Sequence, residues 1–321
     1  MGWDEGRCGN FNSELSKFDR KSRYERNDLN LSNPVLITGG AGSVGRQLAA
    51  MFLAEGRPVR IFDLPFMDFT GLEGEPNVEV VKGDITDSES VSEAVHNVGG
   101  ILHLAALLPP ASERDRDKTF AVNVEGTRNI VDALTTQASK APLVFTSSIS
   151  TYGDTSNESD PISINQPQNA IDIYADSKIA GEKILIGSGV NFVILRIASI
   201  AVPAFLEPPE PWPFTSAQRV EMVHRDDVAD AIKSSVENPE AVGNIFNIAG
   251  GSTWRLTGKD YVEDFFNFMG APVGMAVYRE EPGWNDWYDT TESQKILKYQ
   301  NRSYDFYSGE MKSIVEAMMA E

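Results

Sequence analysis

The sequence contains little cysteine, little histidine and few basic residues. Its 321 residues include one cysteine, Cys8, and three scattered histidines. A single cysteine excludes an intramolecular disulfide and agrees with a reducing compartment, so we expect a cytoplasmic protein. Three isolated histidines do not form the spaced ligand set of a zinc site, and we therefore predict no metal.

Long apolar runs are also missing. No apolar stretch approaches the roughly 18 residues that cross a bilayer, and residues 1–20 contain no apolar segment typical of a signal peptide. Lysine and arginine total 28 against 47 acidic residues, which gives a formal net charge of −19. Because nucleic acids and anionic membranes attract basic surfaces, this charge argues against both as partners.

From Pro34 onward the chain alternates apolar strands with amphipathic helices. Strands are predicted at 35–38, 59–63, 78–81, 100–104, 142–147 and 191–197, and helices at 43–55, 88–97, 117–138 and 172–187. A helix near 225–237 and a strand near 244–248 follow. Almost continuously apolar strands are typical of a parallel sheet with helices on both faces. We therefore predict an α/β fold of the Rossmann type, built on a doubly wound parallel sheet.

The same pattern suggests how the chain is divided. Residues 1–33 are polar and are predicted to be a loosely ordered extension. Residues 34–200 form the predicted nucleotide-binding domain, to which 223–249 return. The proline-rich run 203–213 is incompatible with a central strand. Residues 201–222 and 250–321 are therefore assigned to a smaller C-terminal substrate-binding lobe.

A glycine-rich segment joins the first predicted strand to the first helix. Glycines stand at 39, 42 and 45, directly after Thr38. Glycine lets a backbone turn tightly and approach a pyrophosphate, and a helix N-terminus offers free N–H groups and the positive end of a dipole. The second strand ends in Asp63, and a carboxylate there accepts ribose hydroxyls and repels a 2′-phosphate. The segment predicts a dinucleotide site that favours NAD over NADP, although Arg60 lies nearby in sequence.

A tyrosine and a lysine form the second motif. Tyr174 and Lys178 share one face of a predicted helix, and Tyr174 alone among nine tyrosines has lysine at this spacing. A nearby ammonium stabilises a phenolate and lowers the tyrosine pKa, which suits proton exchange with a substrate hydroxyl. Ser148 follows the strand at 142–147. Because active sites of open α/β sheets lie at the carboxyl ends of strands, Ser148 is placed to hydrogen-bond the reacting oxygen.

Taken together, these motifs resemble those of the extended short-chain dehydrogenase/reductases, the group that contains nucleotide-sugar epimerases and dehydratases. The resemblance runs from about residue 34 to 300. The matching segments are Thr38-Gly39-x-x-Gly42-x-x-Gly45, Asp63, Gly83-Asp84-Ile85, His103-Leu104-Ala105-Ala106, Asn123, Ser147-Ser148, Tyr174-x-x-x-Lys178, Arg196, the run from His224 to Asp230, that from Asn247 to Gly251, and that from Asp289 to Gln300.

The resemblance implies a role for most of the matching residues. The catalytic set would be Ser148, Tyr174 and Lys178, whereas His103 and His224 are expected to be structural. It also implies a homodimer that packs through the helices near 117–138 and 172–187. Its implied cofactor-binding residues are Gly39, Gly42, Ser43, Val44, Gly45, Asp63, Asp84, Ile85, Leu104, Ala105, Ala106, Asn123, Thr146, Tyr174 and Lys178.

The substrate side departs from the family pattern. Ser199 stands where the family usually has an asparagine that helps to hold the substrate's diphosphate region. Nucleotide-sugar epimerases often carry an arginine four residues before the histidine at position 224, where this chain has Val220, with Arg219 one place away. The candidate substrate-binding residues are therefore Ser148, Ser199, Arg219 and Arg255.

Three functions stay open from the sequence. The leading hypothesis is an NAD-dependent oxidoreductase or epimerase that oxidises a secondary hydroxyl of a sugar or nucleotide-sugar-like substrate. Hydride would pass to the nicotinamide and the proton to Tyr174. Retention of NADH would make the protein an epimerase, and release would make it a simple dehydrogenase or ketoreductase. A non-catalytic NAD-binding sensor on the same fold is the alternative of another class.

Overall fold

The computed structural model describes residues 32–159, 161–204 and 208–319, so that nearly all of the predicted N-terminal extension, 1–33, lies outside the described residues. The main sheet has seven strands in the order β3-β2-β1-β4-β5-β6-β9, all paired in parallel. The order reverses between β1 and β4, where open α/β sheets bind ligands. These strands are β1 (Val35–Thr38), β2 (Val59–Asp63), β3 (Val78–Lys82), β4 (Gly100–His103), β5 (Leu143–Ser148), β6 (Phe192–Ile197) and β9 (Asn244–Ile248).

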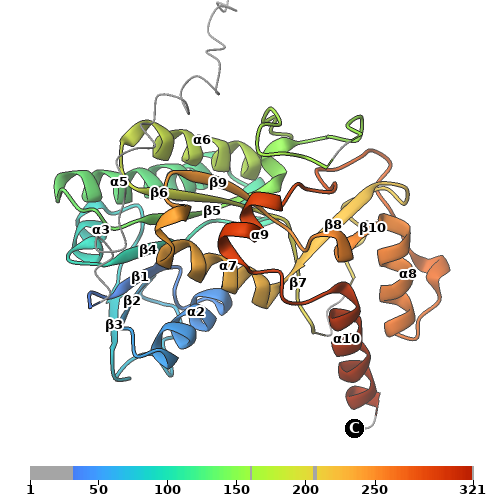
Figure 1. Ribbon diagram of the computed structural model, residues 1–321, viewed down its shortest axis with the longest axis horizontal. Helices are drawn as coiled ribbons and strands as arrows, with labels where there is room; N and C mark the ends of the chain where they lie inside the picture. The colour runs from blue at the N-terminus through green and yellow to red at the C-terminus, as the bar shows by residue number, and fades with distance from the viewer. Residues whose placement is uncertain (1–31, 160, 205–207, 320–321) are drawn as a thin grey trace, which may run out of the picture.

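Helices cover both faces of this sheet (Figure 1). One face carries α2 (Ser43–Ala54), α7 (Arg225–Glu237) and α9 (Thr291–Leu297), and the other carries α3 (Ser88–Val95), α5 (Gly126–Thr136) and α6 (Ile173–Ser188). Successive side chains of a strand point to opposite faces. Val35 and Ile37 accordingly pack under α2, and Leu36 packs under α3 and α5. Burial on both faces explains the continuously apolar strands, and the predicted α/β fold is confirmed.

The helix that we predicted at 117–138 is interrupted by one wider, π-helical turn. It comprises α4 (Arg116–Phe120), a π-helical turn η3 (Ala121–Glu125) and α5. Within η3, the Asn123 amide pairs with the backbone of Leu107: its Oδ1 accepts from the N–H at 2.7 Å and its Nδ2 donates to the carbonyl at 3.1 Å. Wider helical turns of this kind are frequent at functional sites. The local sequence does not reveal this turn, because the contact between Asn123 and Leu107 joins residues that are 16 positions apart.

A smaller lobe lies beside the main sheet, on the right in Figure 1. It holds a three-stranded sheet in the order β10-β8-β7 and has its own largely aromatic core, which includes Trp212, Phe214, Trp254, Tyr261 and Tyr304. Its elements are β7 (Ser199–Ala201), β8 (Arg219–His224), β10 (Arg255–Thr257), α8 (Gly258–Phe268) and α10 (Tyr304–Met319). Short 3-10 turns elsewhere are η2 (Ala111–Glu113), η4 (Ile149–Tyr152), η5 (Pro239–Ala241), η6 (Ser252–Trp254) and η7 (Val273–Met275).

Part of the segment that we assigned to the lobe packs with the main sheet instead. Tyr288, Leu297 and Tyr299 belong to the same core as α2 and α7. The Tyr299 hydroxyl accepts from the N–H of Ala249 at 3.1 Å and donates to its carbonyl at 2.9 Å. The sequence did not separate the two cores because both are lined by aromatic side chains.

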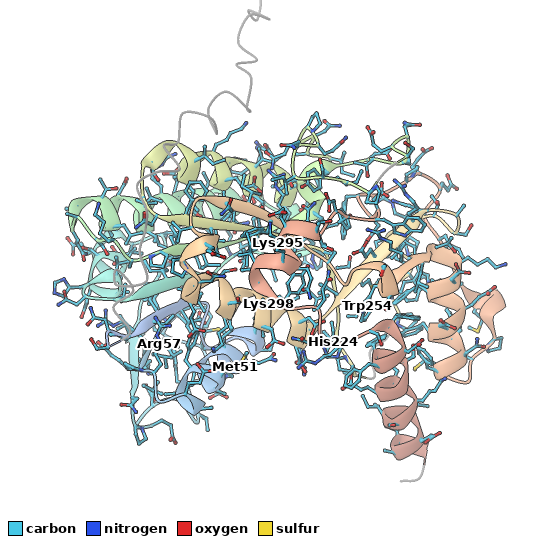
Figure 2. The ribbon with its side chains drawn as sticks, viewed as in Figure 1. Met51, Arg57, His224, Trp254, Lys295 and Lys298 are labelled. Atoms are coloured by element: carbon cyan, nitrogen blue, oxygen red, sulfur yellow. The ribbon has the colours of Figure 1, made fainter. Side chains whose placement is uncertain are left out.

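His224 joins the two parts of the molecule, and Figure 2 shows it between α7 and α10. Its side chain is fully buried. Its Nδ1 accepts the N–H of Asp226 at 3.1 Å and so caps α7, while its Nε2 lies 2.9 Å from Oε2 of Glu310 on α10. Since Nδ1 accepts, Nε2 carries the proton and donates to Glu310. These contacts agree with the structural role predicted for His224.

No described helix is both long and apolar enough to cross a membrane.

Candidate active site

A cavity of about 550 Å³ lies at the carboxyl ends of β1, β4, β5 and β6. It therefore occupies the edge of the sheet at which we expected the site, beside the reversal of strand order. The glycine segment and the proposed catalytic residues meet in its wall. The predicted site residues that line it are Gly39, Gly42, Ser43, Val44, Gly45, Leu104, Ala106, Thr146, Ser148, Tyr174, Lys178 and Ser199.

The glycine segment is shaped for a close backbone approach. Gly39 has φ +69°, and a Cβ on Gly45 would lie 2.6 Å from Cα of Gly40. Gly42 caps α2 without any side-chain hydrogen bond, and the first turn of α2 contains no acidic residue. The N-terminus of α2 thus keeps its N–H groups and its positive dipole end for an anionic ligand. The segment from Gly39 to Gly45 fits the pyrophosphate of a dinucleotide.

Asp63 is fixed beside this segment. Its Oδ2 accepts the N–H of Ala41 at 3.0 Å and its Oδ1 accepts the N–H of Leu64 at 2.8 Å. Arg60 does not turn toward Asp63: its guanidinium pairs with Glu79 at 2.8 Å and donates to the carbonyls of Ala94 and His96. Arg60 is therefore engaged elsewhere and does not offset the negative charge of Asp63, which we expect to favour NAD over NADP.

Five predicted cofactor residues lie outside the described lining of the cavity: Asp63, Asp84, Ile85, Ala105 and Asn123. Asp84 accepts hydrogen bonds from the backbone and hydroxyl of Thr86, and Ile85 packs against Gly126 at the start of α5. Asn123 contacts the helix that carries Tyr174 and does not line the cavity. Its Nδ2 donates to Ser177 Oγ at 2.9 Å, and that hydroxyl donates to the Tyr174 carbonyl at 2.7 Å.

Ser148 presents a hydrogen-bond donor to the cavity. Its Oγ accepts the backbone N–H of Ser150 at 3.1 Å, and its side chain is half-buried in the cavity wall. Because the oxygen is already an acceptor, its hydrogen is available to a substrate oxygen. This geometry suits Ser148 to orient the reacting group.

Two carboxylates fix the start of α6, which carries Tyr174 and Lys178. Asp172 caps the helix by accepting the N–H of Ala175 at 2.7 Å. Glu113 accepts the N–H groups of Ile173 and Tyr174 at 2.9 and 3.0 Å. These interactions satisfy helix N–H groups that otherwise have no partner, and so they hold Tyr174 in place.

Lys178 is buried and lies next to Tyr174. Its Nζ is 5.5 Å from the centre of the Tyr174 ring and 4.9 Å from that of Phe145. Burial lowers the pKa of Lys178 to about 8, against the opposing effect of the Glu182 carboxylate. Lys178 is therefore mostly an ammonium at neutral pH.

The pKa of Tyr174 differs from the sequence prediction. Burial raises it above its ordinary value, and the Asp172 carboxylate adds to the rise. This direction is opposite to the lowering that we expected from Lys178, because burial removes the hydration that stabilises a phenolate. Tyr174 keeps its proton at neutral pH.

A buried polar network lies behind the catalytic residues. Glu182 accepts the Ser147 hydroxyl at 2.5 Å and pairs with Arg196 at 2.7 Å. Arg196 also donates to the hydroxyl of Tyr152 at 2.9 Å, which in turn donates to Asn247 at 2.6 Å. The network connects α6 with β5, β6 and β9, so that it fixes the helix that carries Tyr174 to the sheet.

His103 belongs to the framework. Its Nδ1 lies 2.8 Å from Thr38 Oγ1 and its Nε2 lies 3.0 Å from Thr127 Oγ1. Because the Thr127 hydroxyl donates to the Asn123 carbonyl, Nε2 of His103 is the donor and Nδ1 the acceptor. Burial and the Lys178 ammonium lower the pKa of His103 to about 3. The ring is neutral and structural, as the sequence suggested.

Two of the four predicted substrate residues lie away from the cavity. Arg219 pairs with Asp286 at 2.5 Å, and Arg255 pairs with Glu221 at 3.2 Å. Both guanidinium groups lie over the ring of Trp287. Their partners, Asp286 and Glu221, are buried, which explains why the arginines face them rather than the cavity.

The structure adds lining residues that were not among the predicted site residues. They are Leu108, Pro109, Ser147, Ser150, Asp172, Ile197, Ala198, Ile200, Val228, Ile232 and Trp284. Asp172 had a sequence signal, because an aspartate before a helical pattern is a typical N-cap. Leu108 and Trp284 had none, since the loops that bring them to the site are far apart in sequence. Among the residues that the structure describes, no three His, Cys, Asp or Glu side chains form a group that could hold a metal.

Comparison with known proteins shows the family to which the chain belongs. Residues 35–211 match the NAD dependent epimerase/dehydratase family. The chain is 36% identical over 162 residues to a 3-beta-hydroxysteroid dehydrogenase from Mycolicibacterium neoaurum, a match that covers 48% of this chain and 42% of that protein. It is 33% identical over 183 residues to a D-erythronate dehydrogenase from Cupriavidus necator, with coverage of 52% and 55%. The chain thus spans about half of the length of these curated relatives.

The fold also has solved counterparts. A short-chain dehydrogenase/reductase superfamily protein from Agrobacterium tumefaciens, crystallised with bound NAD, superposes with a TM-score of 0.73. The superposition covers 89% of this chain and 98% of that chain at 23% sequence identity, so it shows a shared fold. The family match spans more than half of the chain and includes the glycine segment, Asp63 and the pair Tyr174 and Lys178. The protein therefore belongs to the NAD dependent epimerase/dehydratase family, and its cofactor is NAD.

Proposed function

We propose that the protein interconverts a secondary alcohol and the corresponding ketone in an NAD-dependent reaction. The observation that carries the proposal is that one cavity holds both the glycine segment and the set Ser148, Tyr174 and Lys178. The sequence-based hypothesis of a sugar or nucleotide-sugar substrate belongs to this proposal.

Each catalytic side chain has a distinct task. When bound, NAD would supply the hydride acceptor for oxidation of the alcohol, and NADH would supply the hydride donor for reduction of the ketone. Ser148 donates a hydrogen bond to the reacting oxygen, because its own oxygen is already occupied as an acceptor. Tyr174 releases its proton to the ketone oxygen in reduction and takes up the hydroxyl proton in oxidation.

Tyr174 carries the proton that is exchanged with the substrate, and Lys178 stabilises the phenolate that remains when the proton leaves. The raised pKa of Tyr174 keeps its phenol protonated, a state suited to reduction. Oxidation requires the phenolate, and the Lys178 ammonium, 5.5 Å from the ring centre, stabilises that charge. The electrostatics of the protein alone thus favour Tyr174 as an acid.

Two alternatives differ in the fate of NADH after hydride transfer. Release of NADH makes the protein a dehydrogenase or ketoreductase, and retention makes it an epimerase. The names of two relatives, a hydroxysteroid dehydrogenase and an erythronate dehydrogenase, support release, whereas that of a UDP-glucose 4-epimerase, 30% identical over 174 residues, supports retention. The third alternative, a non-catalytic NAD sensor, is less favoured because Ser148, Tyr174 and Lys178 all line the cavity.

The variant Tyr174→Phe tests the proposal. We expect NADH-linked turnover of an alcohol panel to fall by about 100-fold or more, while NAD binding remains detectable by calorimetry. Tyr278→Phe, in the lobe, is the matched control and should keep full turnover. Turnover that survives in Tyr174→Phe contradicts the mechanism. NAD binding without turnover of any alcohol by the wild type would favour the sensor.

We also propose that the protein is a cytoplasmic homodimer that associates through α5 and α6. The family resemblance supports the dimer, and the single cysteine supports the compartment. Light scattering after size-exclusion chromatography measures the oligomeric state, and a monomer at micromolar concentration would contradict the proposed dimer.

A further inference from the structure

Asp172 has one carboxylate oxygen that the capping of α6 does not use. Its Oδ1 accepts the N–H of Ala175 at 2.7 Å, whereas its Oδ2 has no hydrogen-bond partner among the residues that the structure describes. The side chain is half-buried and lines the cavity together with Tyr174, and Oδ2 retains accessible surface. A charged acceptor that is open to the cavity therefore lies two residues before Tyr174.

Capping alone does not require a carboxylate at this position. Asparagine and serine cap helices about as well as aspartate, and a partly buried charge loses hydration. Burial raises the pKa of Asp172, and the neighbouring Glu113 carboxylate adds to the rise. A ligand group that donates a hydrogen bond to Oδ2 would replace the lost hydration and stabilise the ionised carboxylate.

Arg279 brings a positive charge from the smaller lobe close to Asp172. Its guanidinium opposes the rise of the Asp172 pKa, yet the two side chains form no ion pair within 4.0 Å. A Cβ on Gly283 would lie 3.0 Å from Nη1 of Arg279, so the guanidinium packs beside the residue that precedes Trp284 of the cavity wall. No residue that the structure describes accepts a hydrogen bond from this guanidinium, whose nitrogens retain accessible surface.

The segment beside Arg279 is held in place by a buried side chain. Gln218 accepts the N–H of Gly283 at 3.1 Å and donates to its carbonyl at 2.9 Å. Its amide nitrogen also donates to the carbonyl of Asn285 at 2.7 Å. These hydrogen bonds fix the backbone on which the Arg279 guanidinium rests.

The end of the cavity at Asp172 differs from the end at which the dinucleotide is expected. The pyrophosphate fits the segment from Gly39 to Gly45, which lies on the main sheet at the N-terminus of α2. Arg279 belongs to the lobe, since its neighbour Tyr278 packs against the lobe core and pairs with Trp212. Asp172, whose charge interacts with that of Arg279, therefore lies toward the lobe rather than toward the glycine segment.

A hydroxyl group is the ligand group that satisfies both charges at once. It can donate its hydrogen to Oδ2 of Asp172 and accept from the guanidinium of Arg279. A carboxylate or phosphate would pair with Arg279 but would be repelled by Asp172 and Glu113. An apolar group would leave both charges without a partner.

We propose that Asp172 and Arg279 determine substrate specificity by binding a second hydroxyl group of the substrate, which is therefore a sugar or another polyol. The assignment rests on the proposed function, because it assumes that the first hydroxyl reacts at Ser148 and Tyr174. The same second hydroxyl is present in a free sugar and in a nucleotide sugar, and the experiment separates these two sources.

Ligand binding to the full-length protein saturated with NADH tests this assignment, because an alcohol cannot be oxidised in that complex. The neutral polyols are methyl β-D-glucopyranoside, methyl β-D-galactopyranoside and myo-inositol, each compared with cyclohexanol. UDP-glucose is compared with UDP, and 3-hydroxycyclohexanecarboxylate is the anionic probe. In titrations by saturation-transfer NMR, we expect at least one polyol, or UDP-glucose, to bind about tenfold more tightly than its comparison compound, the effect of a hydrogen bond to a charged group. The pair that shows the advantage identifies the source.

Asp172→Asn is the decisive variant. The amide oxygen can still cap α6, but the charged acceptor is lost. The variant should abolish the roughly tenfold advantage and keep the urea midpoint and the NADH affinity close to those of the wild type. Asp87→Asn is the matched control, because Asp87 caps α3 through the N–H of Ser90 at 3.2 Å and does not line the cavity. It should leave the advantage intact.

A double-mutant cycle adds a measurement that a purely structural role would not change. Arg279→Gln should also weaken binding of the preferred polyol. The double variant should lose less affinity than the sum of the two single losses, because both side chains act on one hydroxyl. Additive losses would contradict a shared hydroxyl.

Three further results would overturn the assignment: no advantage in either comparison in the wild type, an advantage that survives in Asp172→Asn, or tighter binding of the anionic probe than of every neutral polyol. The proposed function fails in a different way, through turnover that survives in Tyr174→Phe. Binding of a polyol that depends on Asp172, without NADH-linked turnover of any alcohol, would refute the proposed reaction and leave the hydroxyl site standing.

Discussion

Arg196 and Glu182 form an ion pair of 2.7 Å in which neither side chain has any exposed surface. Glu182 follows Lys178 by one helical turn on α6 and also accepts the hydroxyl of Ser147. Arg196 lies on β6, at the centre of the buried network behind the active site. The pair thus anchors the helix that carries Tyr174 to the main sheet, and it connects stability with the geometry of the site.

Glu182→Gln should destabilise the protein by about 3–5 kcal/mol, because it leaves the Arg196 guanidinium buried without a charged partner. Urea denaturation followed by circular dichroism measures the change. Glu125→Gln is the control, since the pair Arg128 and Glu125 at 3.0 Å is largely exposed and its loss should cost less than about 1 kcal/mol. Equal midpoints for the two variants would show that the buried pair contributes no more than the exposed one.

Gly45→Ala should weaken NAD binding by about tenfold or more, because overpacking costs about 1–3 kcal/mol and must displace the glycine segment. The new Cβ would lie 2.6 Å from Cα of Gly40 and 2.7 Å from the Gly39 carbonyl oxygen. Isothermal titration calorimetry with NAD measures the effect. Gly187→Ala on α6 meets nothing within 4 Å and should leave NAD affinity intact. Wild-type affinity in Gly45→Ala would contradict the close approach.

Lys178→Met should change the pH dependence of stability. The Lys178 pKa is about 8 in the folded protein against an ordinary value of 10.5. Between these values the unfolded chain holds a proton that the folded protein has released, so the free energy of unfolding of the wild type rises with pH. Relative to Lys178→Met, the gain should be on the order of 3 kcal/mol across this window. Urea midpoints from pH 7 to 10.5 test this, and parallel curves for the two proteins would refute it.

Asp63→Asn should reduce the preference for NAD over NADP by about tenfold or more, because it removes a negative charge from the position where the 2′-phosphate would approach. Asparagine retains an oxygen that can accept the N–H of Ala41, so the fold should persist. Calorimetric titration with both dinucleotides gives the ratio. The control is Asp68→Asn, which alters an exposed aspartate in the following loop and should leave the ratio of the NAD and NADP affinities unchanged. A wild-type ratio in Asp63→Asn would contradict the role of Asp63 in favouring NAD.

Much of the fold could be predicted from local pattern. The predicted strand at 59–63 coincides with β2, and the helix at 172–187 agrees with α6 within one residue at each end. Strands buried on both faces are largely apolar, and Asp172 and the glycines mark helix boundaries, so the signals are local. The π turn at Asn123 and the packing of Tyr299 on the main sheet were missed, because both depend on contacts between distant segments.

The sequence by itself determined the nucleotide half of the site, since glycine spacing, Asp63 and the pair Tyr174 and Lys178 act through backbone geometry and helix periodicity. The tertiary structure decided the substrate half. It turned Arg219 and Arg255 toward buried carboxylates and raised the pKa of Tyr174 by burial. Burial and charge pairing depend on which segments meet in space, and the order of residues along the chain does not specify that locally.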